Sequence, residues 1–153
     1  MRILVISDSH GMPSRILDAV EAHPEAEALI FLGDGESDIE MLESYCRSLP
    51  SMIRVAGNCD FSSKLPLMRV VTLGGKKIYC THGHAEHVKY GTDELICRAR
   101  QEGADIVLYG HTHSGVTAYD DGLYIMNPGS IRAGHYGMID IVPGGIMLNE
   151  AKL

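Results

Sequence analysis

Five short polar segments carry side chains whose types and spacing suit metal-ion chemistry. Each places carboxylate, amide or imidazole groups beside glycines or other histidines, and in chain order they are Asp8-Ser9-His10, Gly33-Asp34-Gly35, Gly57-Asn58-Cys59-Asp60, Thr81-His82-Gly83-His84 and Gly110-His111-Thr112-His113. Such groups suit Mn²⁺, Fe, Co, Ni or Zn²⁺, and the absence of a C-x-x-C pair argues against a structural zinc site. A single segment of this kind is more often a turn, but five in succession predict a metal centre.

The donors are numerous enough for two ions. His111 and His113 lie two residues apart, and a loop could aim them at two adjacent ions. Two cations about 4 Å apart repel each other, so such a centre needs a bridging anion, and Asp34, isolated between two glycines, is a natural bridge. A water or hydroxide bridging the same ions would be the nucleophile, while the ions hold the phosphoryl oxygens during in-line attack. The pattern therefore predicts hydrolysis of a phosphate ester.

Each polar segment follows a predicted buried strand. These strands are short apolar runs that end at polar residues, and we expect them at residues 2–7, 28–32, 52–56, 76–80 and 105–109. In an open α/β sheet, ligands bind at the carboxyl ends of the strands. The five segments should therefore meet at one edge.

Three helices are expected between the strands. The first begins at Pro13, the second at a capping box formed by Ser37 and Glu40, and the third, capped by Thr92, stops at Gly103. Turn signals at 74–75, 120–122 and 143–145 predict three hairpins. We expect one α/β domain, residues 1–153, with two mixed sheets packed face to face and helices outside. The predicted inward-facing residues of the helices are Ile16, Leu17, Val20, Ile39, Leu42, Tyr45, Cys46, Leu95, Ile96 and Ala99.

Composition limits the partners and the compartment. The formal net charge of −7 disfavours binding to long nucleic acids and anionic membranes. The apolar run before Ser7 is too short for a signal peptide or a membrane span, so we expect a cytoplasmic protein. Hairpin edges could pair to form a homo-oligomer. In that compartment, reduced thiols are expected at Cys46, Cys59, Cys80 and Cys97.

The order D-x-H, G-D, G-N-x-D, H-G-H, G-H-x-H resembles the calcineurin-like metallophosphoesterase superfamily. The resemblance covers residues 8–113 and the turn at 127–130, and the short length is similar to that of its small bacterial and archaeal phosphodiesterase branch. It implies an αββα sandwich, a small phosphate-ester substrate and two divalent ions, Mn²⁺ being the first choice. It also implies that one ion is bound by Asp8, His10, Asp34 and His113, and the other by Asp34, Asn58, His82 and His111.

Cys59 departs from the pattern of the better-known members, which have G-N-H at this point. Their histidine is thought to protonate the leaving group, and a thiol is a poor general acid at an exposed site. His84 could replace it in part or contact the phosphate, so the candidate catalytic residues are His84, Asn58 and Asp34. The departure favours diesters with activated leaving groups. The alternative for Cys59 is a small packed residue, and Asp60 either orients a ligand or caps a turn.

Two other functions are compatible with this pattern. One is a non-catalytic, Vps29-like protein-binding scaffold on the same fold, although the complete ligand set favours an enzyme. The other is a metal-dependent nuclease, against which the negative charge counts. Three residues near the predicted site loops are candidate substrate contacts, with solvated surface as the alternative: Lys89, Tyr90 and Arg132.

Overall fold

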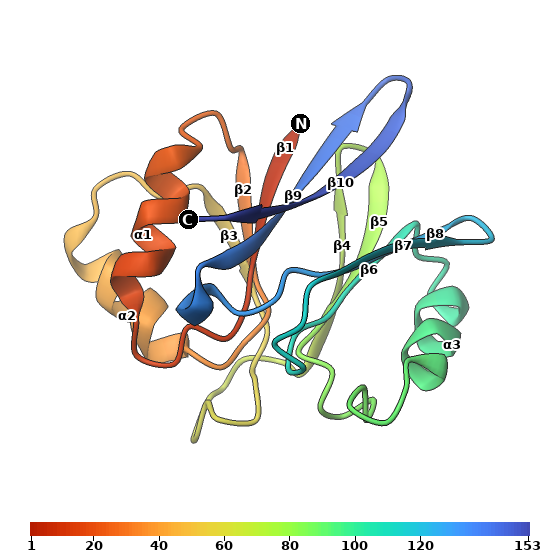
Figure 1. The fold of residues 1–153 in the computed structure, drawn as a ribbon, viewed down its shortest axis with the longest axis horizontal. Helices are drawn as coiled ribbons and strands as arrows, with labels where there is room; N and C mark the ends of the chain where they lie inside the picture. Colours follow the sequence, from red (N-terminus) through yellow and green to blue (C-terminus); the bar gives the residue numbers. More distant parts are fainter.

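The computed structural model describes residues 1–153, and its centre is a pair of five-stranded mixed sheets packed face to face (Figure 1). In the first sheet β1, β2 and β3 are parallel, and β9 and β10 extend it in antiparallel fashion beyond β1. The strand order is β10 (Gly145–Lys152), β9 (His135–Val142), β1 (Arg2–Ile6), β2 (Ala28–Phe31) and β3 (Ser51–Arg54).

The second sheet has a parallel centre and antiparallel edges. Strands β5, β6 and β8 run parallel, with β4 pairing to β5 and β7 pairing to β8. The order is β4 (Met68–Leu73), β5 (Lys76–Thr81), β6 (Ile106–Leu108), β8 (Leu123–Asn127) and β7 (Val116–Asp120). All five strands predicted to precede a polar segment are present.

Alternating burial along the strands divides the core into layers. Ile3 and Val5 of β1 point between the two sheets, where they pack with Ile78 and Ile106 of the second sheet. The intervening residues of β1 face the opposite way, towards the helices of the first sheet. This period of two is what a strand buried on both faces requires, and it explains the continuous apolar run at the N-terminus.

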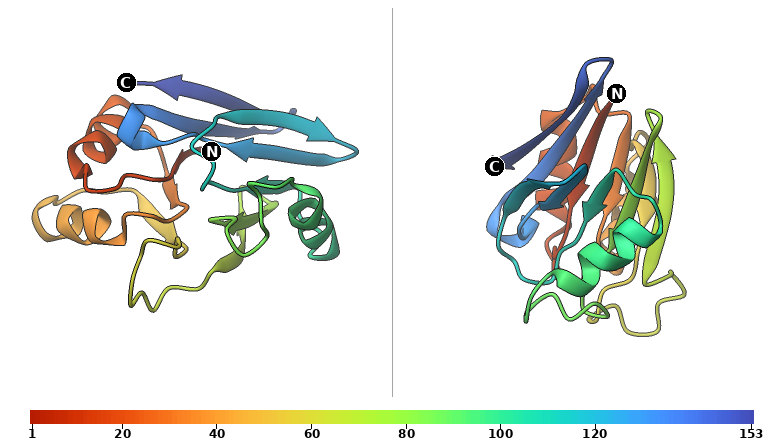
Figure 2. Two further views of the ribbon diagram at one scale, coloured as in Figure 1. Left: turned by 60° about the horizontal axis from the view of Figure 1, so that its bottom comes forward. Right: turned by 90° about the vertical axis from the view of Figure 1, so that its right-hand side faces the viewer.

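The helices cover the outer faces of the two sheets (Figure 2). Helices α1 (Pro13–Ala22) and α2 (Glu36–Tyr45) lie on the first sheet, and α3 (Asp93–Gln101) lies on the second. A 3₁₀ turn, η1 (Ile131–Ala133), precedes β9. The expected αββα sandwich is confirmed. None of the helices has the length and apolar character that crossing a lipid bilayer demands.

Three expectations about the helices are wrong. Helix α2 begins one residue before Ser37, at Glu36, and no side chain of its own caps it. The position before it must be glycine, because a Cβ on Gly35 would collide with the hydroxyl of Ser9. Tyr45, the last residue of α2, is exposed rather than inward-facing. Thr92 occupies the N-cap position of α3, but its hydroxyl makes no capping bond.

Candidate metal centre

The polar segments after β1, β2, β3, β5 and β6 meet at one edge of the two sheets, at the bottom of Figure 1. Four predicted donors form a first group there. Asp8 Oδ1 lies 3.1 Å from His113 Nε2 and 3.6 Å from His10 Nε2. His10 Nε2 is in turn 3.3 Å from His113 Nε2 and 3.7 Å from Asp34 Oδ2. These are the four residues predicted to share one ion.

A second group surrounds the buried ring of His82. Its Nε2 atom lies 3.1 Å from Asn58 Oδ1 and 3.2 Å from His111 Nδ1. The same nitrogen is 3.4 Å from Asp34 Oδ2. One oxygen of Asp34 therefore belongs to both groups, which is the position that the sequence predicted for a bridging carboxylate.

The chemistry of the second group suits a cation. His82 Nδ1 lies 2.8 Å from the carbonyl oxygen of Leu32, which accepts its proton, so that an ion replacing the proton on Nε2 would find a lone pair facing into the group. There it meets the oxygens of Asn58 and Asp34, which are acceptors too. Two donors bound to one ion at about 2.1 Å are separated by about 3.0–3.5 Å, close to the spacings found here. A divalent ion would therefore satisfy three lone pairs at once.

The first group contains a buried atom that lacks a hydrogen-bond partner. Asp8 is fully buried, and its Oδ1 atom accepts no hydrogen bond, whereas Oδ2 accepts from Ser7 Oγ and from the N–H of His111 at 3.2 Å. A buried carboxylate oxygen without a partner is costly unless an ion or water compensates it. Its position between two imidazoles fits a metal ligand.

The electrostatics of the site keep several donors ready to bind. Burial works against the ionised form of Asp34, but the hydrogen bond and charge of His82 hold the pKa of this carboxyl well below its usual range. Burial and the neighbouring His82 lower the pKa of His111 to about 4, and they also lower that of His84. Burial opposes protonation of His82 itself, yet Asp34 and Asp8 raise its pKa. Carboxylates in their charged form and neutral imidazoles are the states that bind metals.

Most of the ligand residues occupy an unusual backbone conformation. Only eight non-glycine residues have positive φ, and five of them are predicted metal ligands: Asp8 (58°), His10 (43°), Asp34 (61°), His111 (65°) and His113 (59°). Left-handed backbone costs about 1 kcal/mol or more for residues with a Cβ. Its concentration at this edge shows that the loops are shaped around the converging donors.

Asp60 ties together the two loops that carry Asp34 and Asn58. One oxygen accepts from the N–H groups of Gly35 and Glu36 at 2.8 and 2.9 Å, and the other accepts from Asp34 and Gly57, both at 2.8 Å. The carboxylate thus caps α2 and fixes the backbone of the bridging ligand. The structure supports both roles that were given as alternatives for Asp60, because the carboxylate caps a turn and also fixes the backbone of a predicted ligand.

Further supports were missed by the sequence analysis because they act across long sequence separations. The carboxylate of Asp38, on α2, accepts hydrogen bonds from Ser9 and Gly11 in the loop of the first histidine. Asn127 donates to the carbonyl of Gly110 and to the hydroxyl of Thr112 at 2.9 and 3.0 Å, which holds the segment of the last two histidines. In the sequence, the one signal for these supports was the turn at residues 127–130, which includes Asn127.

Glu86 is a third missed support. It is buried and accepts hydrogen bonds from Tyr79 Oη at 3.1 Å and Thr81 Oγ1 at 3.0 Å. The same threonine hydroxyl accepts from the N–H of Gly83, so this cluster fixes the turn between His82 and His84. Burial, together with the charge of Glu86, raises the pKa of Tyr79 to about 12.

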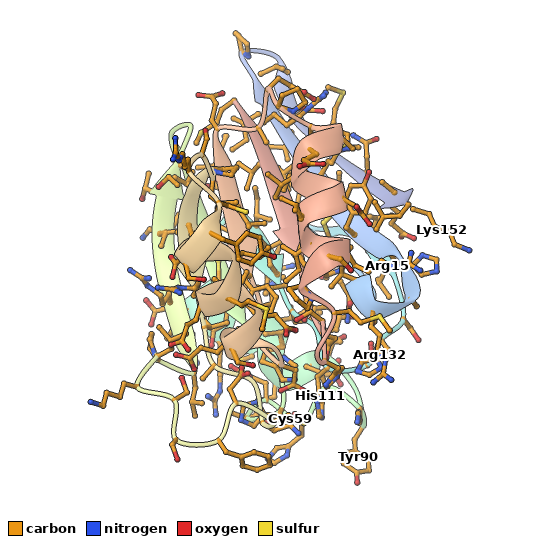
Figure 3. The ribbon with its side chains drawn as sticks, turned by 90° about the vertical axis from the view of Figure 1, so that its left-hand side faces the viewer. Arg15, Cys59, Tyr90, His111, Arg132 and Lys152 are labelled. Atoms are coloured by element: carbon orange, nitrogen blue, oxygen red, sulfur yellow. The ribbon has the colours of Figure 1, made fainter.

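The remaining predicted residues line the rim of the centre. The ring of His84 lies 5.4 Å from that of His82, and its Nδ1 is buried without a partner. Cys59 is exposed, and its thiol pKa is raised by burial of the sulfur and by Asp34. Figure 3 shows Cys59 and His111 at the lower edge, with Tyr90 projecting beyond them.

The predicted substrate contacts differ in their relation to the centre. The ammonium of Lys89 acts on His111, lowering its pKa. Tyr90 is 94% exposed and extends into solvent. Arg132 lies in the 3₁₀ turn η1, and its backbone N–H donates to the Asp8 carbonyl at 3.4 Å. Of these three residues, Lys89 is the one whose charge lowers the pKa of a predicted ligand.

Comparison with known proteins assigns this chain to a family. Residues 1–141 match the calcineurin-like phosphoesterase superfamily domain. The probable metallophosphoesterase YsnB of Bacillus subtilis is 35% identical over 133 residues, covering 86% of this chain and 76% of the relative. The chain therefore belongs to the calcineurin-like phosphoesterase superfamily, and its class is that of the metal-dependent phosphoesterases. This confirms the expectation from the motifs.

Two further relatives point to different functions. Phosphodiesterase YfcE of Escherichia coli is 28% identical over an alignment of 184 residues that covers 100% of this chain and 95% of the relative. Vacuolar protein sorting-associated protein 29 of Schizosaccharomyces pombe is 35% identical over 138 residues, covering 85% of this chain and 72% of the relative. Hydrolysis and protein sorting are therefore both represented among the relatives.

Proposed function

We propose that this protein is a dinuclear phosphodiesterase. The observation that carries the proposal is the position of Asp34 Oδ2, which lies within 3.7 Å of His10 Nε2 and 3.4 Å of His82 Nε2. A carboxylate oxygen shared by two groups of donors is what a pair of adjacent cations needs to offset their repulsion.

The donors divide into two sets that share this carboxylate. When bound, two divalent ions would lower the pKa of a water molecule to give the nucleophile and would neutralise charge on the phosphoryl oxygens. Mn²⁺ is the first choice by resemblance to the family, and the oxygen and nitrogen donors also suit Ni²⁺, Zn²⁺, Fe or Co²⁺. The first ion would be held by Asp8, His10, Asp34 and His113, and the second by Asp34, Asn58, His82 and His111.

Residues at the rim would bind and orient the ester. Asn58 is exposed, so its amide nitrogen can donate to a phosphoryl oxygen on the open side of the centre. His84 lies beside His82 and would donate to the phosphate or to the departing oxygen. Lys89 adds positive charge on the side of His111. In a chain of net charge −7, this local cationic character favours a small diester over a long nucleic acid.

The free thiols are one argument for the cellular compartment that we propose. All four cysteines are unpaired, which suits the reducing environment of the cytoplasm, and a cytoplasmic location forms part of this proposal.

A screen of metals against substrates tests the proposal. The metal-free chain would be loaded with Mn²⁺, Ni²⁺, Zn²⁺ or Co²⁺ and assayed on bis(p-nitrophenyl) phosphate and p-nitrophenyl phosphate. We expect metal-dependent cleavage with the diester preferred. Asp34→Asn should lower kcat/KM by about 100-fold or more, because it removes the shared charge. Asp18→Asn, an exposed change on α1, is the matched control. Activity that survives Asp34→Asn would exclude the bridging role.

A protein-binding scaffold is the second candidate function, favoured by the 35% identity to vacuolar protein sorting-associated protein 29. The two candidates differ in what they require of the metal ligands. An enzyme needs every donor, and all seven are present and converge here. A chain that binds none of the four metals and leaves both substrates intact would favour the scaffold.

A further inference from the structure

Cys59 places a sulfur atom at the rim of the metal centre. Its Sγ atom, His10 and a carboxylate oxygen of Asp34 all lie within 4.8 Å of one another. The position is fixed from two sides. The N–H of Cys59 donates to Asp34 Oδ1 at 2.7 Å, and Asn58 Nδ2 donates to the sulfur at 3.4 Å. The thiol is therefore held beside the predicted bridging ligand.

A second observation indicates that this position is built for a cation. Asp8 Oδ1 is buried, has no hydrogen-bond partner and lies 3.6 Å from Nε2 of His10, whose ring also belongs to the group with Cys59. An unpaired carboxylate oxygen and an imidazole thus face the space beside which the sulfur lies. Cys59 itself is exposed, so its sulfur borders this space on the open side.

We propose that Cys59 is a metal ligand of this centre for thiophilic ions, forming with His10 and Asp34 a mixed sulfur, nitrogen and oxygen site. The inference rests on the proposed metal centre and concerns which ions it prefers. Thiolate ligands select Zn²⁺, Co²⁺ and Cd²⁺ over the harder Mn²⁺, which favours oxygen. On binding, the sulfur forms a bond to the ion and the thiol proton is released to solvent.

A Cys59 that binds metal would affect the choice of ion, which a Cys59 that only fills space would not. The sulfur would occupy a coordination position on the solvent side, where a phosphate oxygen would otherwise approach. A thiophilic ion would thus be bound more tightly than Mn²⁺. The centre would discriminate between ions through a residue that is outside the seven predicted donors.

Cobalt spectroscopy tests the sulfur–metal bond directly. Metal-free protein would be titrated with Co²⁺ while its absorption spectrum is recorded. We expect a near-ultraviolet sulfur-to-cobalt charge-transfer band in the parent chain and its loss in Cys59→Ser. Cys97→Ser is the matched control, because Cys97 is an exposed thiol on α3, outside the centre, and this variant should keep the band.

Competition between ions supplies the quantitative test. Cys59→Ser should weaken Cd²⁺ binding by about tenfold or more, as loss of a metal-site contact does, while Mn²⁺ binding changes little. Thermal unfolding and far-ultraviolet circular dichroism of the metal-free variant would establish that it folds. An unchanged ratio of Cd²⁺ to Mn²⁺ affinity would overturn the proposal.

The outcomes separate this inference from the proposed function. If Co²⁺ binds and gives visible ligand-field bands but no sulfur band, the metal centre stands and the role of Cys59 is excluded. If neither Co²⁺ nor Mn²⁺ binds to the parent chain, the centre itself fails and the inference fails with it.

Discussion

Asp34 uses its two carboxylate oxygens for different purposes. Oδ1 accepts the N–H of Cys59 at 2.7 Å, which locks the loop after β3 against the loop after β2. Oδ2 faces His10 and His82 and remains available to an ion. Gly57 is required beside it, because a Cβ there would collide with the Asp34 carboxylate. Gly57, the glycine of the G-N-x-D motif, therefore leaves the space that the Asp34 carboxylate needs to act as the proposed bridging ligand.

His84 is expected to affect leaving groups unequally. If its imidazole donates a proton to the departing oxygen, His84→Ala should lower kcat/KM about 100-fold for a diester with a poor alkoxide leaving group. The loss should be much smaller for bis(p-nitrophenyl) phosphate, whose leaving group needs little protonation. A plot of kcat/KM against leaving-group pKa for both proteins measures the difference.

His87→Ala provides the control for this comparison, since His87 lies in the same loop but is exposed to solvent. Equal losses across all leaving groups in His84→Ala would leave His84 only a contact to the phosphate and would exclude the acid role.

The convergence of the seven predicted donors at one edge could be predicted from sequence, but most of their supports could not. The donors stand out because imidazoles and carboxylates directly follow buried strands, so their positions depend only on local pattern. Asp60 stands out in sequence only as the last residue of the G-N-x-D motif, and Glu86 looks like an ordinary acidic residue. Their roles depend on N–H and hydroxyl groups that only the folded chain brings within reach, in the case of Asp60 from residues up to 26 positions away.

Helix α2 illustrates the same limit at the scale of an element. The Ser37 and Glu40 pattern predicts a capping box, but the helix starts at Glu36, one residue earlier. Its first N–H groups bond instead to Asp60, which arrives from the loop after β3. Strands β1, β2 and β6 were predicted well because they are buried on both faces, whereas the start of this helix is decided by a tertiary contact.

Asp60→Asn is expected to weaken both the helix and the site. An amide has one acceptor oxygen, so two of the four N–H groups would face its NH₂ group. We expect a loss of about 3 kcal/mol in the free energy of unfolding, measured by urea titration. Metal affinity should fall by about 10-fold to 100-fold because the backbone of Asp34 loses its anchor.

In this experiment Asp18→Asn again serves as the exposed control. If Asp60→Asn unfolds at the same urea concentration as the parent chain, the carboxylate does not hold the two loops together.

In strand β5, the hydroxyl of Tyr79 should make the free energy of unfolding depend on pH. Burial and the charge of Glu86 raise the pKa of Tyr79 to about 12, so the folded chain keeps a proton that the unfolded chain loses near its ordinary value of about 10. The contribution of Tyr79 is complete below the lower pKa and is lost as pH rises through the higher one. In that interval the parent chain should lose up to about 1.4 kcal/mol more per pH unit than Tyr79→Phe.

Urea unfolding at a series of alkaline pH values measures this slope. Cys80, whose pKa burial also raises to about 12, is present in both proteins and cancels in the comparison. Parallel stability profiles for the parent chain and Tyr79→Phe would show that the tyrosine proton is not retained on folding.

At the scale of the whole molecule, the predicted ligands are divided between the two sheets. The loops of the first sheet supply Asp8, His10, Asp34 and Asn58, and those of the second supply His82, His111 and His113. Each group of donors draws on both sheets. Bound ions would therefore link the sheets at the edge where their loops meet, whereas between the sheets the contacts are apolar side chains.

Removal of metal should therefore destabilise the fold as a whole. An ion present at about 100 times its dissociation constant stabilises the folded state by about 2.7 kcal/mol. We expect Mn²⁺ to raise the melting temperature and a chelator to reverse the change, as measured by differential scanning calorimetry. His113→Ala should reduce the shift, because it removes one donor from the first group. A melting temperature that does not respond to Mn²⁺ or to the chelator would contradict this linkage.

The left-handed backbone at five of the ligands has an evolutionary consequence. A glycine would adopt these angles without strain, and Asn or Asp would adopt them more easily than His. At His10, His111 and His113, the residue that the proposed hydrolysis requires is thus a poor choice for folding at the same position. A lineage that is no longer selected for hydrolysis would gain stability by replacing these histidines one at a time. It would keep the fold after losing the activity.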